Sequence, residues 1–172
     1  QTTAVLEGDH YLVNGSKCFI TNGSFSKPYV ITAQTDKSQG QKGIVALVVD
    51  RDTDGFSIEK GETKLGMRGS DWTNLVFQDC KVPADNLLGT PETGFITFMK
   101  TLEGGRISIG ALSLGIAQGA LDQAVKYANE REQFGKHLSK HQAVAFKLAD
   151  MRTEIAAARH LVYHSARMKD AG

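Results

Sequence analysis

Short apolar runs separated by clusters of turn-forming residues make up the first half of the chain. The runs are rich in β-branched and aromatic residues, and no helical stretch lies between them, which is typical of an antiparallel sheet or barrel. The expected strands cover residues 11–13, 17–21, 29–35, 44–49, 56–59 and 74–78. Asn14-Gly15 separates the first two runs and predicts a two-residue hairpin turn. Residues 60–71, with glycines among charged residues, predict an exposed loop.

The second half of the chain follows a helical pattern. Over residues 94–132, apolar residues recur at spacings of three to five, as one buried helix face requires. Phe134-Gly135 predicts a glycine cap that closes this helix. A second helix is expected from Ser139, as its N-cap, to about Lys169. The apolar faces of two such long helices require further helices or neighbouring subunits to cover them.

The change from a strand pattern to a helix pattern marks a domain boundary. No strand is expected to continue through Pro83, and no strand pattern follows it. We therefore expect an α+β chain, in which an antiparallel, β-barrel-like domain over residues 1–88 is followed by a helical domain over residues 89–172. The chain starts with Gln1 and stops directly after a helical pattern, so both ends are expected to be cut.

Charge and cysteine content exclude several classes of protein. The 172 residues carry 20 basic and 19 acidic side chains, a net charge of +1, which predicts no nucleic-acid partner. No apolar run approaches the roughly 20 residues that a membrane-spanning helix needs. Two cysteines, Cys18 and Cys80, in a chain large enough to form a core favour free thiols in a reducing compartment.

The helical half holds most of the candidate chemistry. Two pairs of histidines with a spacing of four lack a third ligand, so no metal site is expected. Glu103 and Arg106 lie three apart on an apolar helix face, and form either an ordinary ion pair or a site for a ligand that passes close to the backbone. Arg131 and Gln142 lie in the polar connection between the helices, where both side chains can reach one phosphate.

A series of motifs runs in a fixed order through nearly the whole chain: GSKCFITNG from Gly15, KLGMRGS from Lys64, VFQDCKVP from Val76, Gly105-Arg106, GIAQ from Gly115, YANEREQFG from Tyr127, and His141-Gln142. In this order and spacing the chain resembles a segment of the acyl-CoA dehydrogenase family, nearest its short-chain, butyryl-CoA type members. The resemblance implies a middle β domain and the first two helices of a four-helix bundle that assembles into dimers or tetramers. It also implies that an upstream helical domain and the last two bundle helices are absent.

The resemblance implies FAD as the cofactor and assigns residues to it. Phe19-Ile20-Thr21 match a stretch that lies against the isoalloxazine, with Thr21 hydrogen-bonding near N5. The family often has Trp at the position of Phe19, so the ring packing is kept and an indole N–H contact is lost. Arg131, Phe134 and Gln142 match residues that contact the FAD of a neighbouring subunit, the arginine at the pyrophosphate.

The resemblance also assigns substrate positions. Glu103 and Arg106 match residues at which the acid meets the CoA moiety and the arginine steadies the catalytic region, and Lys42 is expected near the CoA adenine. In the isovaleryl and long-chain branches the catalytic glutamate directly precedes the helix arginine, where this chain has Gly105. In most other branches it lies beyond the position of Gly172. No catalytic residue is therefore expected in this chain.

By resemblance, the expected function is flavin-dependent α,β-dehydrogenation of an acyl-CoA thioester, with short chains favoured, to the trans-2-enoyl-CoA. A glutamate takes the α proton, the β hydrogen leaves as hydride to the flavin, and an electron-transferring flavoprotein accepts the electrons. The alternatives are an acyl-CoA oxidase or an inert FAD-binding or assembly fragment. The expected compartment is the bacterial cytoplasm or the mitochondrial matrix.

Overall fold

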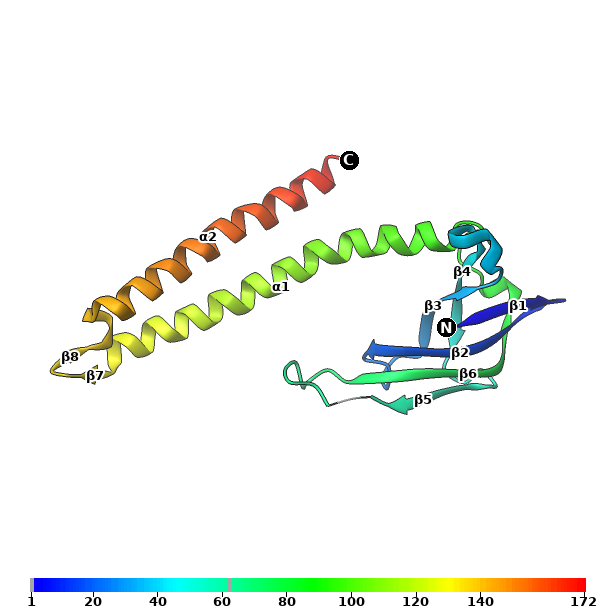
Figure 1. Cartoon of the computed structure of the whole chain (residues 1–172), viewed down its shortest axis with the longest axis horizontal. Coiled ribbons are helices and arrows are strands. Elements are labelled where there is room, and N and C mark those ends of the chain that lie inside the picture. Colours follow the sequence, from blue (N-terminus) through cyan, green and yellow to red (C-terminus); the bar gives the residue numbers. More distant parts are fainter. Residues whose placement is uncertain (1, 62) are drawn as a thin grey trace. The chain divides into compact units, whose positions relative to one another are not determined.

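The structure is a computed structural model that describes residues 2–61 and 63–172 (Figure 1). The chain forms two compact units, Gln1–Thr101 and Leu102–Gly172. A mostly antiparallel six-stranded sheet lies in the first unit, and most of two long helices lies in the second. This confirms the α+β fold class, whereas the expected domain division at residue 88 stays a prediction. No helix in the described part of the chain is long and apolar enough to cross a membrane.

The sheet has the strand order β4-β3-β1-β2-β6-β5. Its strands are β1 (Thr3–Glu7), β2 (His10–Thr21), β3 (Pro28–Gln34), β4 (Ile44–Asp50), β5 (Phe56–Lys60) and β6 (Trp72–Pro83). All neighbours pair antiparallel except β1 and β3, which meet in parallel at Thr3 and Gln34. Short 3-10 segments cover Lys37–Gly43 (η1) and Ala84–Asn86 (η2).

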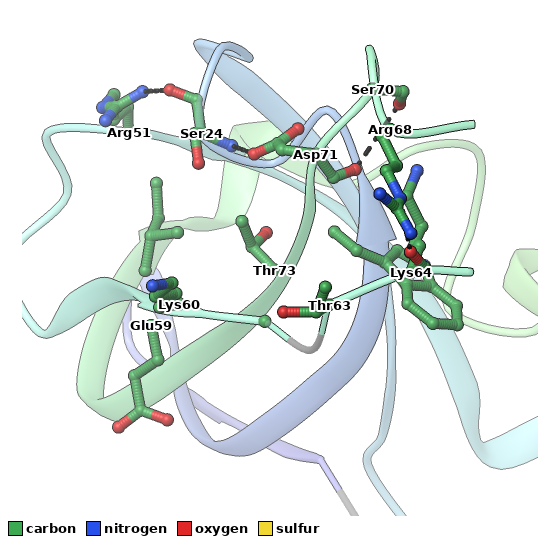
Figure 2. A pocket seen from close by; sticks show the side chains of 13 residues that line it. Ser24, Arg51, Glu59, Lys60, Thr63, Lys64, Arg68, Ser70, Asp71 and Thr73 are labelled. Atoms are coloured by element: carbon green, nitrogen blue, oxygen red, sulfur yellow. Dashed lines mark hydrogen bonds between the residues drawn. The ribbon is translucent and has the colours of Figure 1, made fainter. Parts of the chain in front are cut away.

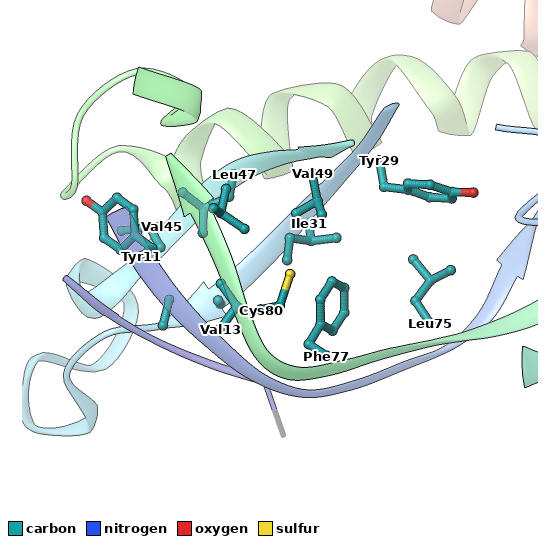
Figure 3. Close-up of a cluster of buried hydrophobic side chains, with 13 residues drawn as sticks. Tyr11, Val13, Tyr29, Ile31, Val45, Leu47, Val49, Leu75, Phe77 and Cys80 are labelled. Atoms are coloured by element: carbon teal, nitrogen blue, oxygen red, sulfur yellow. The ribbon is translucent and has the colours of Figure 1, made fainter. Parts of the chain in front are cut away.

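The core of the first unit lies within the curve of this sheet (Figure 3). Alternate residues of β2, β3, β4 and β6 point into it, as a strand with one buried face requires. Leu47, Leu75 and Phe77 are almost fully buried, and each such side chain contributes about 1.5–3 kcal/mol relative to an exposed one. Cys80 is a buried free thiol whose pKa is raised to about 11 by burial and, secondarily, by the charge of Asp54.

The hairpin predicted at Asn14-Gly15 is wrong. β2 runs straight through these residues, and the hairpin turn lies earlier, at Gly8-Asp9, between the paired residues Glu7 and His10. The Asn14 side chain instead bonds Asp79 on β6: Asn14 Nδ2 donates to Asp79 Oδ1 (3.1 Å), and the Asp79 N–H donates to Asn14 Oδ1 (2.8 Å). A long-range contact thus converts a local turn signal into an irregularity within a strand.

In the second unit, α1 (Gly94–Glu130) and α2 (Gln142–Asp170) pack through a small apolar cluster. Leu114, Leu121 and Ala128 are buried at intervals of seven residues, two helical turns, and therefore share one face of α1. Ile155 meets this face from α2, and Arg159 Nη2 donates to Gln118 Oε1 (2.8 Å). Large apolar side chains elsewhere on both helices remain exposed.

The connection between the helices differs from its prediction. α1 ends at Glu130, and a small hairpin of β7 (Glu132–Gln133) and β8 (Lys136–His137) follows. Phe134 and Gly135 are the two turn residues of this hairpin, and both have positive φ (53° and 75°), as a type I′ turn requires. The glycine therefore serves the hairpin turn rather than a helix cap.

Ser139 is not the N-cap of the second helix. It lies inside a 3-10 turn, η3 (Leu138–Lys140), and α2 begins only at Gln142. His141 takes the N-cap position without a side-chain capping bond; its carbonyl accepts the N–H groups of Val144 and Ala145, both at 2.9 Å. The hairpin and the turn that follows it thus delay the start of the helix.

Candidate functional site

A β-bulge interrupts the pairing of β2 with β6 at the first candidate cluster. Lys17 pairs with Leu75 and Ile20 pairs with Thr73, so two residues of β2, Cys18 and Phe19, stand opposite one residue of β6. Phe19 has φ = 61°, the left-handed region that bulky side chains rarely adopt. Such a conformation costs about 1–3 kcal/mol and commonly marks a functional site. The bulge also leaves backbone groups unpaired with the neighbouring strand.

The Phe19 ring stacks on Trp72, the first residue of β6. The ring centroids are 4.6 Å apart and the ring planes are inclined by 31°. A stack of this kind contributes about 0.5–1.5 kcal/mol and offsets part of the backbone strain. Phe19 nevertheless remains 60% exposed, so the ring is accessible to a ligand. No sequence motif assigns a role to Trp72, the only tryptophan of the chain.

Ile20 and Thr21 follow Phe19 at the end of β2. Ile20 is half-buried and packs against the core, so it anchors the bulge, whereas Thr21 is exposed. Within the described residues the Thr21 hydroxyl has no hydrogen-bond partner. An exposed apolar ring two residues before an exposed hydroxyl can meet a planar heterocycle with polar edges. The side chains of Phe19-Ile20-Thr21 are thus compatible with the isoalloxazine that the family resemblance implies.

The turn after β2 is tied to the loop before β6. The Asn22 N–H donates to the Asp71 carbonyl (3.2 Å), the Ser24 N–H donates to Asp71 Oδ2 (2.9 Å), and the Ser70 hydroxyl donates to Asn22 Oδ1 (2.7 Å). Figure 2 shows Ser24 and Asp71 in this arrangement. These bonds fix the ends of both strands that carry Phe19 and Trp72.

A cavity of about 520 Å³ lies beside this turn (Figure 2). Trp72 and Thr73 line it, together with four basic side chains, Arg51, Lys60, Lys64 and Arg68, and two acidic ones, Glu59 and Asp71. The sequence predicts only an exposed loop over residues 60–71. Residue 62 lies outside the described residues. The glycines and charges of this loop do not reveal a cavity, because the other wall comes from residues far away in the sequence.

Asp71 makes the stability of this region depend on pH. Hydrogen bonding by Ser24, first by its side chain and less strongly by its N–H, outweighs the opposing effect of burial and lowers the pKa of the Asp71 carboxyl below its ordinary value. A folded-state pKa that is lowered stabilises the fold above the unfolded pKa, and this stabilisation is lost as the pH falls through the folded-state pKa.

We therefore expect the melting temperature of the wild-type chain to fall more steeply below about pH 4 than that of Asp71→Asn. Thermal unfolding followed by circular dichroism between pH 7 and pH 3 measures this. Asp52→Asn, which removes an exposed carboxylate from a nearby turn, is the control and should follow the wild-type curve. Parallel curves for wild type and Asp71→Asn would contradict the assignment.

A second candidate cluster lies at the junction of the two helices. Arg131 follows α1 directly, Phe134 is a turn residue of the β7–β8 hairpin, and Gln142 opens α2. All three side chains are exposed, Phe134 to 92%. The Leu138 N–H donates to the Arg131 carbonyl (2.9 Å), and His141 Nε2 lies 3.0 Å from the Gln133 carbonyl, which closes the junction on itself. All three residues thus lie in, or at the end of, the short, hydrogen-bonded connection between α1 and α2.

The remaining candidates are more scattered. Glu103 and Arg106 are exposed on α1, and no ion pair joins them among the residues that the structure describes. Gly104, between them, leaves room for Lys169 Nζ, which a Cβ atom at this position would approach to 2.6 Å. Lys42 is exposed in η1. No group of three potential metal-ligating side chains is found within residues 2–61 and 63–172.

Comparison with known proteins identifies the family. The model for the acyl-CoA dehydrogenase middle domain matches residues 1–80, and the model for the acyl-CoA dehydrogenase C-terminal domain matches residues 92–172, so only residues 81–91 are unmatched. The chain belongs to the acyl-CoA dehydrogenase family. Enzymes of this family are FAD-dependent.

Three relatives show how similar the chain is to characterised members. The short-chain specific acyl-CoA dehydrogenase of Clostridium acetobutylicum is 53% identical over the whole chain, which covers 45% of that protein. The caffeyl-CoA reductase-Etf complex subunit CarC of Acetobacterium woodii is 48% identical, with 98% of this chain and 45% of the relative covered. The structure of butyryl-CoA dehydrogenase from Megasphaera elsdenii matches with a TM-score of 0.94 and 50% identity, over 98% of this chain and 44% of that one. The chain thus spans less than half the length of these relatives.

Proposed function

We propose that this chain is part of a short-chain acyl-CoA dehydrogenase, which converts an acyl-CoA thioester to the trans-2-enoyl-CoA and passes the electrons to an electron-transferring flavoprotein. The observation that carries the proposal is the strained, exposed Phe19 ring, two residues before the uncommitted Thr21 hydroxyl, in a chain of this family. Similarity to the Clostridium enzyme supports the short-chain substrate. Similarity to a subunit of a complex named for Etf supports the electron acceptor.

Two clusters of the chain would hold FAD. Phe19 stacks against the ring system, Ile20 anchors the bulge, and the Thr21 hydroxyl bonds a polar edge of the ring. Arg131 meets the diphosphate with a charge-assisted hydrogen bond, which is stronger than a neutral one. Bound FAD supplies the hydride acceptor for the oxidation. In the homo-oligomer that is typical of the family, Arg131, Phe134 and Gln142 serve the cofactor of a neighbouring subunit.

Other residues of the chain would bind substrate without performing proton transfer. Glu103 meets the CoA moiety, Arg106 steadies the reacting region, and Lys42 lies near the adenine. Gly105 has no side chain, and Glu103 lies two residues away, about 200° around the helix from it. Glu103 therefore does not replace a base at position 105. We assign the ring contacts and Lys42 to the β domain over residues 1–88, and the diphosphate contact and the other CoA contacts to the helical domain over residues 89–172.

We expect the 172-residue chain to bind FAD and to leave it oxidised when butyryl-CoA is added. FAD titration followed by visible absorption and flavin fluorescence measures binding, and loss of the visible flavin band under anaerobic conditions measures turnover. Failure to bind FAD would contradict the proposed site. Bleaching that disappears in Glu103→Gln would contradict our assignment of Glu103 and identify it as the base.

A further inference from the structure

The strained conformation of Phe19 has a specific partner in the next strand. Thr21 pairs with Trp72 in the β2–β6 register. Because of the bulge, Phe19 also lies at this end of the two strands, close to Trp72. The two rings stack at 4.6 Å. Because a left-handed bulky residue persists only where its surroundings hold it, the stack with Trp72 is one of the contacts that fix the direction of the Phe19 ring.

Trp72 is itself held from both sides. It directly follows Asp71, whose carbonyl and carboxylate accept the N–H groups of Asn22 and Ser24. The Trp72 carbonyl lies so close to Gly61 that a Cβ atom there would collide with it. The indole is half-buried, whereas Phe19 is 60% exposed. Trp72 is therefore carried on a fixed backbone and is the more buried ring of the pair, and Phe19 is the ring that can meet a ligand.

We propose that Trp72 is a positioning residue of the flavin site: it holds the Phe19 ring against the isoalloxazine, which leaves the indole one aromatic ring away from the flavin. The inference rests on the proposed FAD site but goes beyond it, because it assigns the orientation of the Phe19 ring to a residue of β6. Phe19 alone, on an unsupported bulge, would bind the flavin less tightly.

The experiment compares Trp72→Phe and Trp72→Ala with the wild-type chain, each titrated with FAD. Loss of the stack in Trp72→Ala is expected to weaken FAD binding by about three- to tenfold, whereas Trp72→Phe keeps a ring and should stay within about twofold. Phe25→Ala, which removes a 76% exposed aromatic ring from the turn after β2, is the matched control and should bind FAD as the wild type does.

The fluorescence lifetime of the bound flavin separates positioning from a general structural role. An indole one aromatic ring away from a flavin quenches its emission by short-range electron transfer, and a phenyl ring does not. Trp72→Phe should therefore lengthen the lifetime at unchanged affinity, and a second change, Phe19→Trp, should shorten it again. Thermal unfolding of each variant identifies any loss of folding. A folding defect in Trp72→Ala would not affect the lifetime test, which uses Trp72→Phe.

FAD affinity and flavin lifetime together distinguish the role of Trp72 from the existence of the flavin site. If FAD binds to the wild type and to Trp72→Ala equally, and the lifetime in Trp72→Phe is unchanged, the role of Trp72 is overturned while the flavin site stands. If the wild-type chain does not bind FAD, the proposed site fails and this inference fails with it. Weaker binding by Trp72→Ala together with a longer lifetime in Trp72→Phe supports the inference.

Discussion

Arg131→Ala is expected to weaken FAD binding by about ten- to a hundredfold, the largest effect of any single change in the candidate site. A hydrogen bond to a charged group contributes about 1.5–3 kcal/mol, and each 1.4 kcal/mol corresponds to roughly tenfold in affinity. Arg131 suits this role because its backbone is fixed on both sides: its N–H donates to the Tyr127 carbonyl (2.8 Å) and its carbonyl accepts the Leu138 N–H. The guanidinium is exposed and can present its fork of donors to a diphosphate.

FAD titration of the variants at one salt concentration checks this prediction. Lys136→Ala is the control, because it removes a positive charge from the same connection between the helices. If Arg131 makes a specific contact, Lys136→Ala should change the affinity by less than about threefold, since a distant exposed charge is largely screened. Arg131→Lys, which keeps the charge but loses the planar fork, should lie between wild type and Arg131→Ala. Equal effects of Arg131→Ala and Lys136→Ala would replace the specific contact with general electrostatic attraction.

The strands could be predicted wherever hydrophobic alternation is local. The expected strand over residues 44–49 agrees with β4 (Ile44–Asp50), and the expected strand over residues 29–35 agrees with β3 (Pro28–Gln34). The prediction failed at Asn14-Gly15, because the partner that keeps this segment within the strand is Asp79, 65 residues away. Local turn chemistry cannot report such a partner, which depends on how β2 and β6 pair.

The candidate site divides in the same way. The motifs predict Phe19-Ile20-Thr21, Arg131 and Gln142 as cofactor residues, and the structure shows that Ile20 is half-buried and the other four are exposed. The positive φ of Phe19 and its stack on Trp72 could not be predicted, since both arise from a bulge in the pairing of strands that are distant in sequence. Residue identity therefore predicts a ring contact at Phe19, but only the β2–β6 register explains how Trp72 supports this ring.

The core beneath the site leads to the second large effect. The Phe77 ring is 2% exposed and lies 5.4 Å from the Phe56 ring, which in turn lies 4.9 Å from the Tyr29 ring. The Tyr29 hydroxyl lies 2.6 Å from the Gly23 carbonyl and 2.8 Å from the Ser26 carbonyl. A chain of aromatic contacts thus joins the centre of the core to the turn that follows β2.

Phe77→Ala is expected to lower the free energy of unfolding by about 3–5 kcal/mol, because it removes buried apolar surface and leaves a cavity. Urea denaturation followed by the fluorescence of Trp72, the only tryptophan and a residue of the sheet, measures this loss. Phe25→Ala should change stability by no more than about 0.5 kcal/mol, since Phe25 is exposed. Phe77→Leu refills most of the volume and should recover much of the loss.

The same changes should affect FAD binding, because β6 carries both Phe77 and Trp72. Phe77→Ala should weaken FAD binding, and Phe77→Leu should restore it. A stable Phe77→Ala variant would mean that other contacts hold β6 in place.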